Sequence, residues 1–238
     1  MFGIKTVKRK GGRDEAEKPF WISFSDLMTA LMVLFLVAMA AALMAVTKDL
    51  AKIQTTEQER KDGVASCFAD MAELSTLSGV KARERDHSIE FGTLVEYSDN
   101  DDKLSPAAER FIRSFVPKVL EVARHGQCQP WLKRVVVEGF ASNTGHYLYN
   151  LNLSYLRSQR VLCVLLSSTV PDMLTEADRR EIQTLFLVGG SSFNTTQTLD
   201  KAQMRRVELK LEFLDKPKAD DVKMGEIPLD PGVRCPNS

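Results

Sequence analysis

The chain has 238 residues, of which 44% are hydrophobic and 27% charged, and its 32 basic and 32 acidic side chains give a net charge of zero. A balanced charge provides no long-range attraction to a polyanion, so we expect no nucleic-acid partner. The length allows one folded domain in addition to a membrane segment, a linker and a tail.

Residues 1–19 are expected to form a basic cytoplasmic segment that sets the orientation of the chain in a membrane. Its Lys and Arg side chains favour the cytoplasmic side, whereas the acidic residues between them have little influence. Phe20 and Trp21 then fit the aromatic belt at the membrane surface. This pattern predicts a single-pass protein of the inner membrane, with a cytoplasmic N-terminus and a periplasmic C-terminal domain.

Residues 20–46 predict the transmembrane helix. The segment has about 27 residues, and a span needs about 20 apolar residues at about 1.5 Å rise each. A cleaved signal peptide is the alternative, because Ala38-Met39-Ala40 has the small residues of a cleavage site. Against cleavage, the apolar run continues past that site and contains an acidic residue.

Asp26 is the only charged residue within this span. A carboxylate in a membrane helix costs roughly 2.5–3.5 kcal/mol near the helix centre, and a helix that only anchors a protein has no reason to carry that cost. We therefore predict that Asp26 carries an ion, H⁺ rather than Na⁺, and that no cofactor is involved. The alternative is a polar residue near the lipid headgroups in a helix that merely anchors.

Ser25 and Thr29 are predicted to support the ion path beside Asp26. Thr29 follows one turn later and could donate a hydrogen bond to the carboxylate, or instead to its own helix backbone. A single helix cannot enclose a polar path, because charge exposed to lipid is not sustained. The sequence thus predicts a multispan partner subunit and at least a homodimer of this chain.

Residues 47–85 are expected to form a helical linker that could also plug the ion path. Apolar residues share one helix face on both sides of Lys61-Asp62-Gly63, where we expect the helix to break. An apolar stripe just outside a membrane usually packs on a partner helix, although a plain linker fits the pattern equally well.

Residues 86–214 alternate between expected strands and helices. Strands are expected from alternating or β-branched residues at 87–97, 134–140, 185–188 and 206–213, with Gly189-Gly190 ending the third. Helices are expected at 105–124, at 153–167 and after Thr175, whose spacing to Asp178 matches a capping box. This order predicts an α+β fold in which helices cover a mixed sheet. The proline-containing residues 215–238 indicate an extended tail.

Four cysteines would lie on the periplasmic side: Cys67, Cys128, Cys163 and Cys235. An even number in an oxidising compartment permits two disulfides, and three pairings remain open. Cys163 lies in the apolar stretch 161–166, which favours a buried free thiol at that position. The cysteine spacing does not match a metal site.

Two separate patterns resemble known families. The first comprises Trp21, Asp26, Leu27, Met28, Thr29, Leu31 and Met32. It resembles the signature helix of the MotB flagellar stator subunit and its relatives. The second comprises residues 137–145, 149–158 and 204–209, and resembles the OmpA-like peptidoglycan-binding domain. Together they imply a periplasmic OmpA-like α/β sandwich over residues 86–214.

The resemblance implies roles for particular residues. Asp26 matches the carboxylate that binds the driving ion of rotary stators. Arg157 matches the arginine that grips the diaminopimelate carboxylate of a peptide stem, and Ser142 stands where the family often has an aspartate that pairs with a stem amine. The other matching positions shape or flank this groove: Tyr149, Asn150, Leu153 and Arg206.

Elementary chemistry supports an anion site here but leaves structural alternatives. A helix start after a strand and loop presents N–H groups, and the planar guanidinium of Arg157 matches a carboxylate. Arg157 could instead form a surface salt bridge with Glu138 or Glu208. Arg206 could simply stabilise the fold, and Asn150 could cap a turn.

The short connecting segment and compact domain are most similar to the ZorB family of Zorya anti-phage defence systems. This resemblance implies a peptidoglycan-anchored subunit of an ion-driven rotary motor, with five MotA- or ZorA-type subunits per two copies of this chain. A flagellar stator subunit and a passive tether to peptidoglycan without ion flow are the alternatives. We expect no enzymatic activity, because no nucleophile motif such as Gly-x-Ser-x-Gly occurs.

Overall fold

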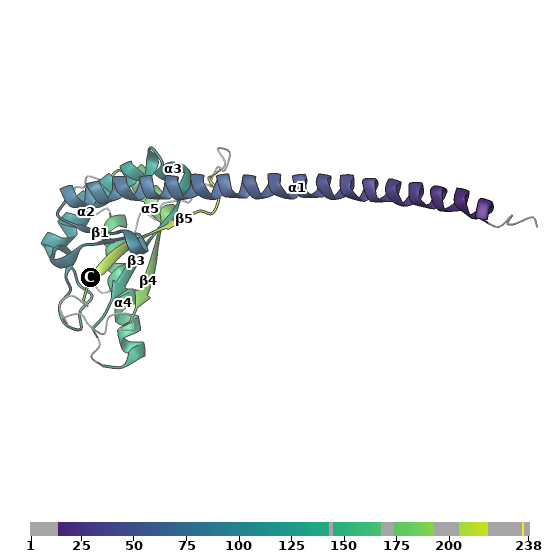
Figure 1. Ribbon diagram of the computed structural model, residues 1–238. Helices are drawn as coiled ribbons and strands as arrows, with labels where there is room; N and C mark the ends of the chain where they lie inside the picture. Colours follow the sequence, from purple (N-terminus) through teal and green to yellow (C-terminus); the bar gives the residue numbers. More distant parts are fainter. Residues whose placement is uncertain (1–13, 143–144, 168–173, 193–204, 219–234, 236–238) are drawn as a thin grey trace, which may run out of the picture. The chain divides into compact units, whose positions relative to one another are not determined.

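The computed structural model describes residues 14–142, 145–167, 174–192, 205–218 and 235 (Figure 1). Side chains are described from Trp21 onward. The chain divides into two compact units, Met1–Thr56 and Glu57–Ser238. The first contains most of one long helix, and the second contains a five-stranded sheet with its helices. We describe each unit by itself.

The long helix α1 runs without interruption from Asp14 to Leu77. Among the described residues it is the one helix long and apolar enough to cross a membrane, with a mean hydropathy of 2.6 in its most apolar window, where every side chain is exposed. The predicted break at Lys61-Asp62-Gly63 is wrong. Gly63 remains helical, and a Cβ there would lie 2.1 Å from Nε1 of Trp131, so the glycine admits a close indole contact instead of ending the helix.

The sheet of the second unit has the strand order β1-β2-β5-β3-β4. Its strands are β1 (Lys81–Arg83), β2 (Ser88–Glu90), β3 (Leu132–Phe140), β4 (Phe186–Ser191) and β5 (Val207–Phe213). Strands β3 and β4 are parallel, and the other neighbours are antiparallel. This arrangement confirms the predicted mixed sheet and the α+β class.

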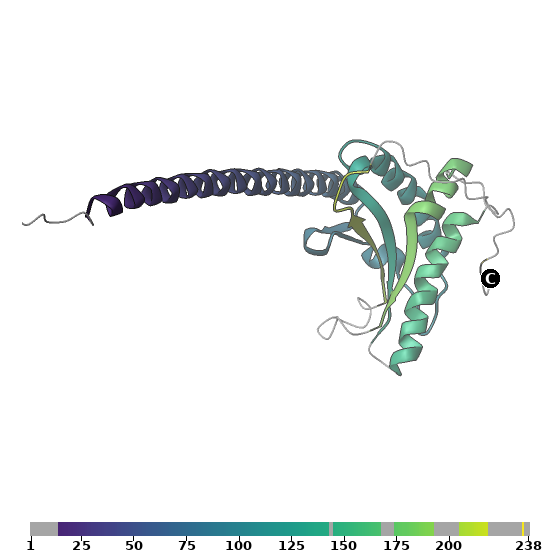
Figure 2. The same ribbon diagram turned by 90° about the vertical axis from the view of Figure 1, so that its right-hand side faces the viewer.

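Helices cover one face of this sheet. They are α2 (Pro106–Arg124), α3 (Cys128–Trp131), α4 (Tyr147–Leu166) and α5 (Glu176–Leu185). Figure 2 shows α4 and α5 along the same side of β3 and β4, and α2 packs against α4. Both predicted helix caps are confirmed: Ser105 caps α2 by accepting from Ala108 N, and Thr175 forms a capping box with Asp178 in α5.

The predicted strand over residues 87–97 is too long. Only Ser88–Glu90 pairs as β2, and a 3₁₀ helix follows at Gly92–Val95. Gly92 adopts φ +55°, a conformation that glycine tolerates, and the turn lets Phe91 and Val95 both enter the core. The edge strand β1 and the 3₁₀ helix Glu84–Asp86 were not predicted.

Two further predicted boundaries are wrong: the start of helix α4 and the end of strand β4. Helix α4 begins at Tyr147, six residues earlier than expected, because Asn150 already faces the interior with Leu153 and Arg157. Gly189-Gly190 lie inside β4 and do not end it. A Cβ at Gly190 would lie 2.8 Å from the backbone N of Tyr155, so these glycines let the helix approach the strand.

All four cysteines form disulfides. Cys67 pairs with Cys128, with Cα atoms 4.6 Å apart, and Cys163 pairs with Cys235 at 5.5 Å. The expected free thiol at Cys163 is therefore wrong, because Cys235 returns from the tail to α4. Pairing across 61 and 72 residues was not visible in the sequence, since it depends on the folded positions of the two partners.

The last part of α1, residues 57–77, packs into the second unit. Cys67 and Met71 are fully buried. The ring of Phe68 packs edge-to-face on the ring of His87, with the ring centres 5.3 Å apart. The His87 ring packs in the same way on Phe213, at 5.2 Å. Arg60 donates from Nε to the Leu214 carbonyl at 3.0 Å. The part of the predicted linker that follows Thr56 is thus an integral element of the fold.

Candidate functional site

The first candidate site lies on the exposed apolar part of α1. Spaced at three and four residues, five side chains line one hollow of the helix surface: Trp21, Ile22, Ser25, Asp26 and Thr29. This spacing places the acid and both hydroxyls on the same face, as predicted. Because it is formed by a single helix, this hollow is open to its surroundings on the other side.

The hydroxyl of Thr29 bonds to the helix backbone. Its Oγ1 lies 3.0 Å from the carbonyl of Ser25 and 2.9 Å from the carbonyl of Asp26. Of the two alternatives for Thr29, the structure thus shows the backbone bond and not a bond to the Asp26 carboxylate. Thr29 therefore shapes the helix surface beside Asp26 without touching its charge.

The second candidate site lies in the second unit, where β3 ends and α4 begins. Ser142, Asn150 and Leu153 are buried there, whereas Tyr149 is half exposed. Close packing brings the two elements together: a Cβ on Gly139 would lie 2.0 Å from the Ser154 carbonyl oxygen. These positions therefore converge, although ten residues lie between Ser142 and Leu153 in the sequence.

Arg157 lies one helical turn after Leu153 in α4 and is 0% exposed. Its guanidinium donates from Nε to the Asp101 carbonyl at 3.0 Å and from Nη1 to the Phe140 carbonyl at 2.9 Å. A third bond runs from Nη2 to the Ser98 carbonyl at 3.0 Å. The arginine thus fastens the 98–101 loop to the end of β3, and the alternative of a surface salt bridge with Glu138 or Glu208 is wrong.

The surroundings of Arg157 explain its electrostatics. Burial lowers the pKa of Arg157, and the nearby Tyr97 partly opposes this shift. The guanidinium lies 5.1 Å from the centre of the Tyr97 ring, whose hydroxyl donates to the Arg157 carbonyl at 2.7 Å. Burial raises the pKa of Tyr97 above its usual range. For Arg157 to grip a ligand carboxylate, the 98–101 loop has to move aside.

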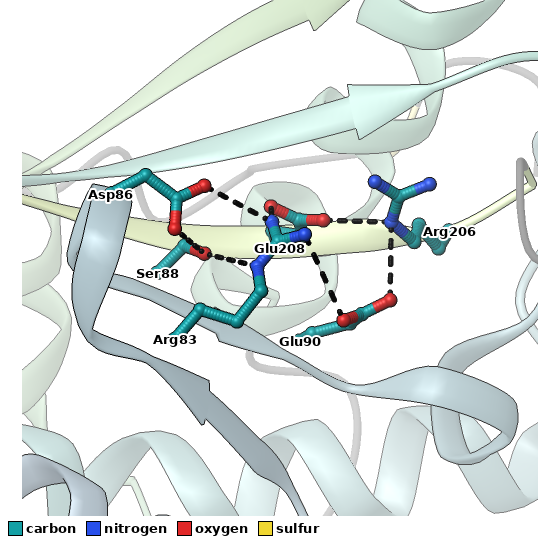
Figure 3. A network of polar contacts seen from close by, with 6 residues as sticks. All are labelled: Arg83, Asp86, Ser88, Glu90, Arg206 and Glu208. Atoms are coloured by element: carbon teal, nitrogen blue, oxygen red, sulfur yellow. Dashed lines mark hydrogen bonds and ion pairs between the residues drawn. The ribbon is translucent and has the colours of Figure 1, made fainter. Parts of the chain in front are cut away.

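Arg206 belongs to a polar network with Arg83, Glu90 and Glu208 (Figure 3). Its Nε donates to Glu208 Oε1 at 2.7 Å and lies 3.4 Å from Glu90 Oε1. Arg83 pairs with the other oxygen of Glu208 and donates to Ser88 Oγ at 3.1 Å. Burial raises the pKa of Glu208 even though Arg206 favours its charged form.

The environment of Arg206 fits the alternative of a fold-stabilising residue. The side chain is buried, and its guanidinium lies 4.3 Å from the centre of the Phe140 ring.

The sequence reasoning missed Tyr97 and the Ser98 and Asp101 carbonyls as partners of Arg157. The polar run Asp99-Asn100-Asp101-Asp102 is typical of a loop, but nothing local indicates that a buried arginine holds it.

The N-terminal region of the chain is similar to a known family of membrane proteins. Residues 5–71 match the family described as membrane MotB of the proton-channel complex MotA/MotB. This match covers the whole apolar part of α1 together with Asp26 and the first disulfide-bonded cysteine. A MotB-type membrane helix followed by a mixed-sheet domain therefore defines the class of protein.

The full length of the chain identifies the family. The chain is 38% identical over 231 residues to the Zorya protein ZorB of Escherichia coli O139:H28 (strain E24377A / ETEC), covering 93% of both proteins. The chain belongs to the ZorB family.

Solved structures show similar but more distant folds. A putative MotB-like protein from Desulfovibrio vulgaris matches 67% of this chain and 94% of its own, with 18% identity and a TM-score of 0.42. The OmpA-like domain of FopA1 from Francisella tularensis subsp. tularensis SCHU S4 matches 57% of this chain and 81% of its own, with 18% identity and a TM-score of 0.38. With both TM-scores below 0.5, the family assignment depends on the ZorB relative.

Proposed function

We propose that this chain is the wall-anchored subunit of an ion-driven, stator-like membrane motor that acts in anti-phage defence. The observation that carries the proposal is Asp26, the only charge in residues 20–46, on a helix that matches the MotB family. The defence role is supported by the ZorB relative, which covers 93% of the chain. Intramembrane acids are expensive and mark ion paths.

The proposed topology has the N-terminus in the cytoplasm and the second unit in the periplasm. The basic residues before the span favour this orientation. The two disulfides, Cys67–Cys128 and Cys163–Cys235, support it independently, because both lie on the C-terminal side of the span and such bonds persist in oxidising compartments.

The partner proposed for α1 is a multispan MotA- or ZorA-type subunit, five per two copies of this chain, with H⁺ as the ion. The open hollow around Asp26 supports the need for a partner, because a carboxylate facing lipid on every side is too costly. Protonation of Asp26 would remove its charge and change which partner surface the helix prefers.

The proposed ligand of the second unit is the peptide stem of peptidoglycan. Supporting residues are Ser142, Tyr149, Asn150 and Leu153, which gather where β3 ends and α4 begins. Arg157 would act on this stem crevice by setting the position of the 98–101 loop. Ser142 can offer a hydroxyl to the stem but no charge.

Phage protection by the complete operon tests this proposal. The variants are Asp26→Asn, which is nearly isosteric, and Asp49→Asn, which removes an acid from the same helix outside residues 20–46. Tyr149→Ala tests wall binding, because its exposed side chain is removable without opening the core. Arg157→Ala is unsuitable, since it would leave the buried Phe140 carbonyl and the part-buried Ser98 and Asp101 carbonyls without this donor.

We expect loss of protection for Asp26→Asn at normal abundance and full protection for Asp49→Asn. Full protection by Asp26→Asn with loss in Tyr149→Ala would mean a passive tether to the wall. Swimming motility measured in parallel separates a flagellar role from a defence role.

A further inference from the structure

The surface of helix α4 differs from that of the two other long helices that cover the sheet, α2 and α5. Its only charged residues, Arg157 and Arg160, are both buried, so its solvent-facing side carries no charge. In contrast, α2 exposes Arg110 and Lys118, and α5 exposes Glu176 and Arg180. In a chain with 27% charged residues, an uncharged helix surface indicates a binding surface.

Tyrosines are concentrated on this uncharged surface. The chain has four tyrosines, and three of them are exposed on the first nine residues of α4: Tyr147, Tyr149 and Tyr155, at 43%, 51% and 41%. Leu148, between the first two, is 73% exposed. Asn152 is also exposed and adds an amide, and Gln159 adds a second at the edge of the same side. Leu148, Asn152, Tyr155 and Gln159 follow one another along one side of α4, and Tyr147 and Tyr149 flank that side. We call these six residues the tyrosine face.

The chemistry of the tyrosine face suits a neutral ligand rich in hydroxyl groups. A tyrosine ring offers an apolar surface together with a polar hydroxyl and loses little entropy when it is immobilised. Side-chain amides both donate and accept hydrogen bonds. Sugar rings are complementary, because their C–H faces pack on aromatic rings and their hydroxyl groups bond to amides. The absence of charge argues against a charged polymer.

The position of the tyrosine face identifies which carbohydrate fits. Tyr149 belongs both to this face and to the proposed stem crevice, and Asn150 of the crevice follows it in the same helical turn. A stem held in the crevice is covalently joined to its glycan strand, so the strand has to pass close to the start of α4. We propose that the tyrosine face binds the glycan strand of peptidoglycan beside the stem, an inference that rests on the proposed wall binding.

Binding of full-length protein in detergent tests this proposal with three probes. These are intact peptidoglycan sacculi, stripped glycan, and a free stem peptide containing diaminopimelate. The stripped glycan is freed of its stems by an amidase and then amidated at the released lactyl carboxylates, so that it is as neutral as the strand in the wall. The variants are Tyr155→Ser and Leu148→Ser, with Tyr155→Phe retaining the ring. Leu187→Ser is the matched control, because this leucine is 44% exposed on β4, outside the tyrosine face.

We expect Tyr155→Ser and Leu148→Ser to weaken binding to stripped glycan by about five- to tenfold, as for an interface anchor. Binding to the stem peptide should be unchanged in both, and Tyr155→Phe and Leu187→Ser should resemble wild type. Unchanged glycan binding in both serine variants would overturn the inference. So would a loss confined to self-association in sedimentation, which would assign the tyrosine face to a second copy of this chain.

The same probes separate this inference from the proposed function. Wild-type protein that binds stripped glycan but not the stem peptide would support the tyrosine face and contradict the stem crevice. Wild-type protein that binds the stem peptide but not stripped glycan would support the proposed stem site and contradict the tyrosine face. Binding to neither probe would overturn both.

Discussion

The two parts of helix α1 both carry large apolar side chains, but in opposite environments. From Trp21 to Thr56 nearly every side chain is exposed, including a long series of Leu, Met, Phe and Val. From Glu57 to Leu77 the helix is amphipathic, and Val64, Cys67, Phe68 and Met71 are buried in the second unit. The comparison teaches that an apolar helix surface does not itself say what covers it: the later part is covered by this chain, whereas the earlier part has no cover within this chain among the described residues.

A pair of methionines measures this difference most directly. Met71 is 0% exposed and Met39 is 50% exposed. Met71→Ala should lower the free energy of unfolding of the second unit by about 2–5 kcal/mol, because it leaves a cavity in the core. Met39→Ala should leave it unchanged. Pulse proteolysis of the full chain in urea and detergent measures both, and equal effects would break the comparison.

The Cys67–Cys128 disulfide should stabilise the packed position of residues 57–77. It closes a loop of 61 residues, so replacing both cysteines with serine should cost about 2–4 kcal/mol. Trypsin should then cleave sooner at Lys61 on α1. The matched variant Cys163→Ser/Cys235→Ser should lose stability without faster cleavage at Lys61. Equal cleavage in the two variants would contradict this role.

Gly63→Ala tests whether α1 packs on Trp131, because the substitution should stabilise the fold without this contact and destabilise it with the contact. Helix propensity alone predicts stabilisation by about 1 kcal/mol. Contact with Trp131 predicts the opposite, a loss of about 1–3 kcal/mol, because a Cβ would lie 2.1 Å from the indole nitrogen. Thermal unfolding of the two proteins decides between these results. A raised melting temperature would mean that the segment does not pack on Trp131.

The smallest expected effect concerns Glu208, a buried acid of the second unit. Burial raises its pKa above the ordinary value of 4.5, so the folded state holds this proton to higher pH than the unfolded chain does. Its contribution to stability is therefore present below pH 4.5 and is lost as pH rises through the folded pKa. Glu208→Gln should flatten the pH dependence of unfolding in that range. Parallel pH profiles for the two proteins would refute this assignment.

Local signals in the sequence predicted those elements that depend on neighbouring residues. The cap at Ser105, the capping box of Thr175 and the strand near 206–213 were all found, because a cap or an alternating pattern involves residues within one or two turns. The glycines were misread for the same reason. Gly63 and Gly190 look like helix and strand breakers locally, but each admits a partner that is distant in the sequence.

The candidate site was only partly predictable. The grouping of Asp26, Ser25 and Thr29 follows from helical spacing alone, and the structure shows it. The role of Arg157 was not predictable, because its three acceptors come from a loop about 58 residues earlier and from the end of β3. The uncharged side of α4 became visible only once Arg157 and Arg160 were known to be buried.

The sequence by itself determined that one apolar helix carries a single acid, that a basic segment precedes it, and that an α+β domain follows. These features depend on composition and short-range periodicity, which need no knowledge of distant contacts. Only the tertiary structure decided which cysteines pair, that residues 57–77 belong to the domain, and that Arg157 clamps a loop. Burial and pairing are set by residues far apart along the chain, and a local pattern contains no information about which of them meet.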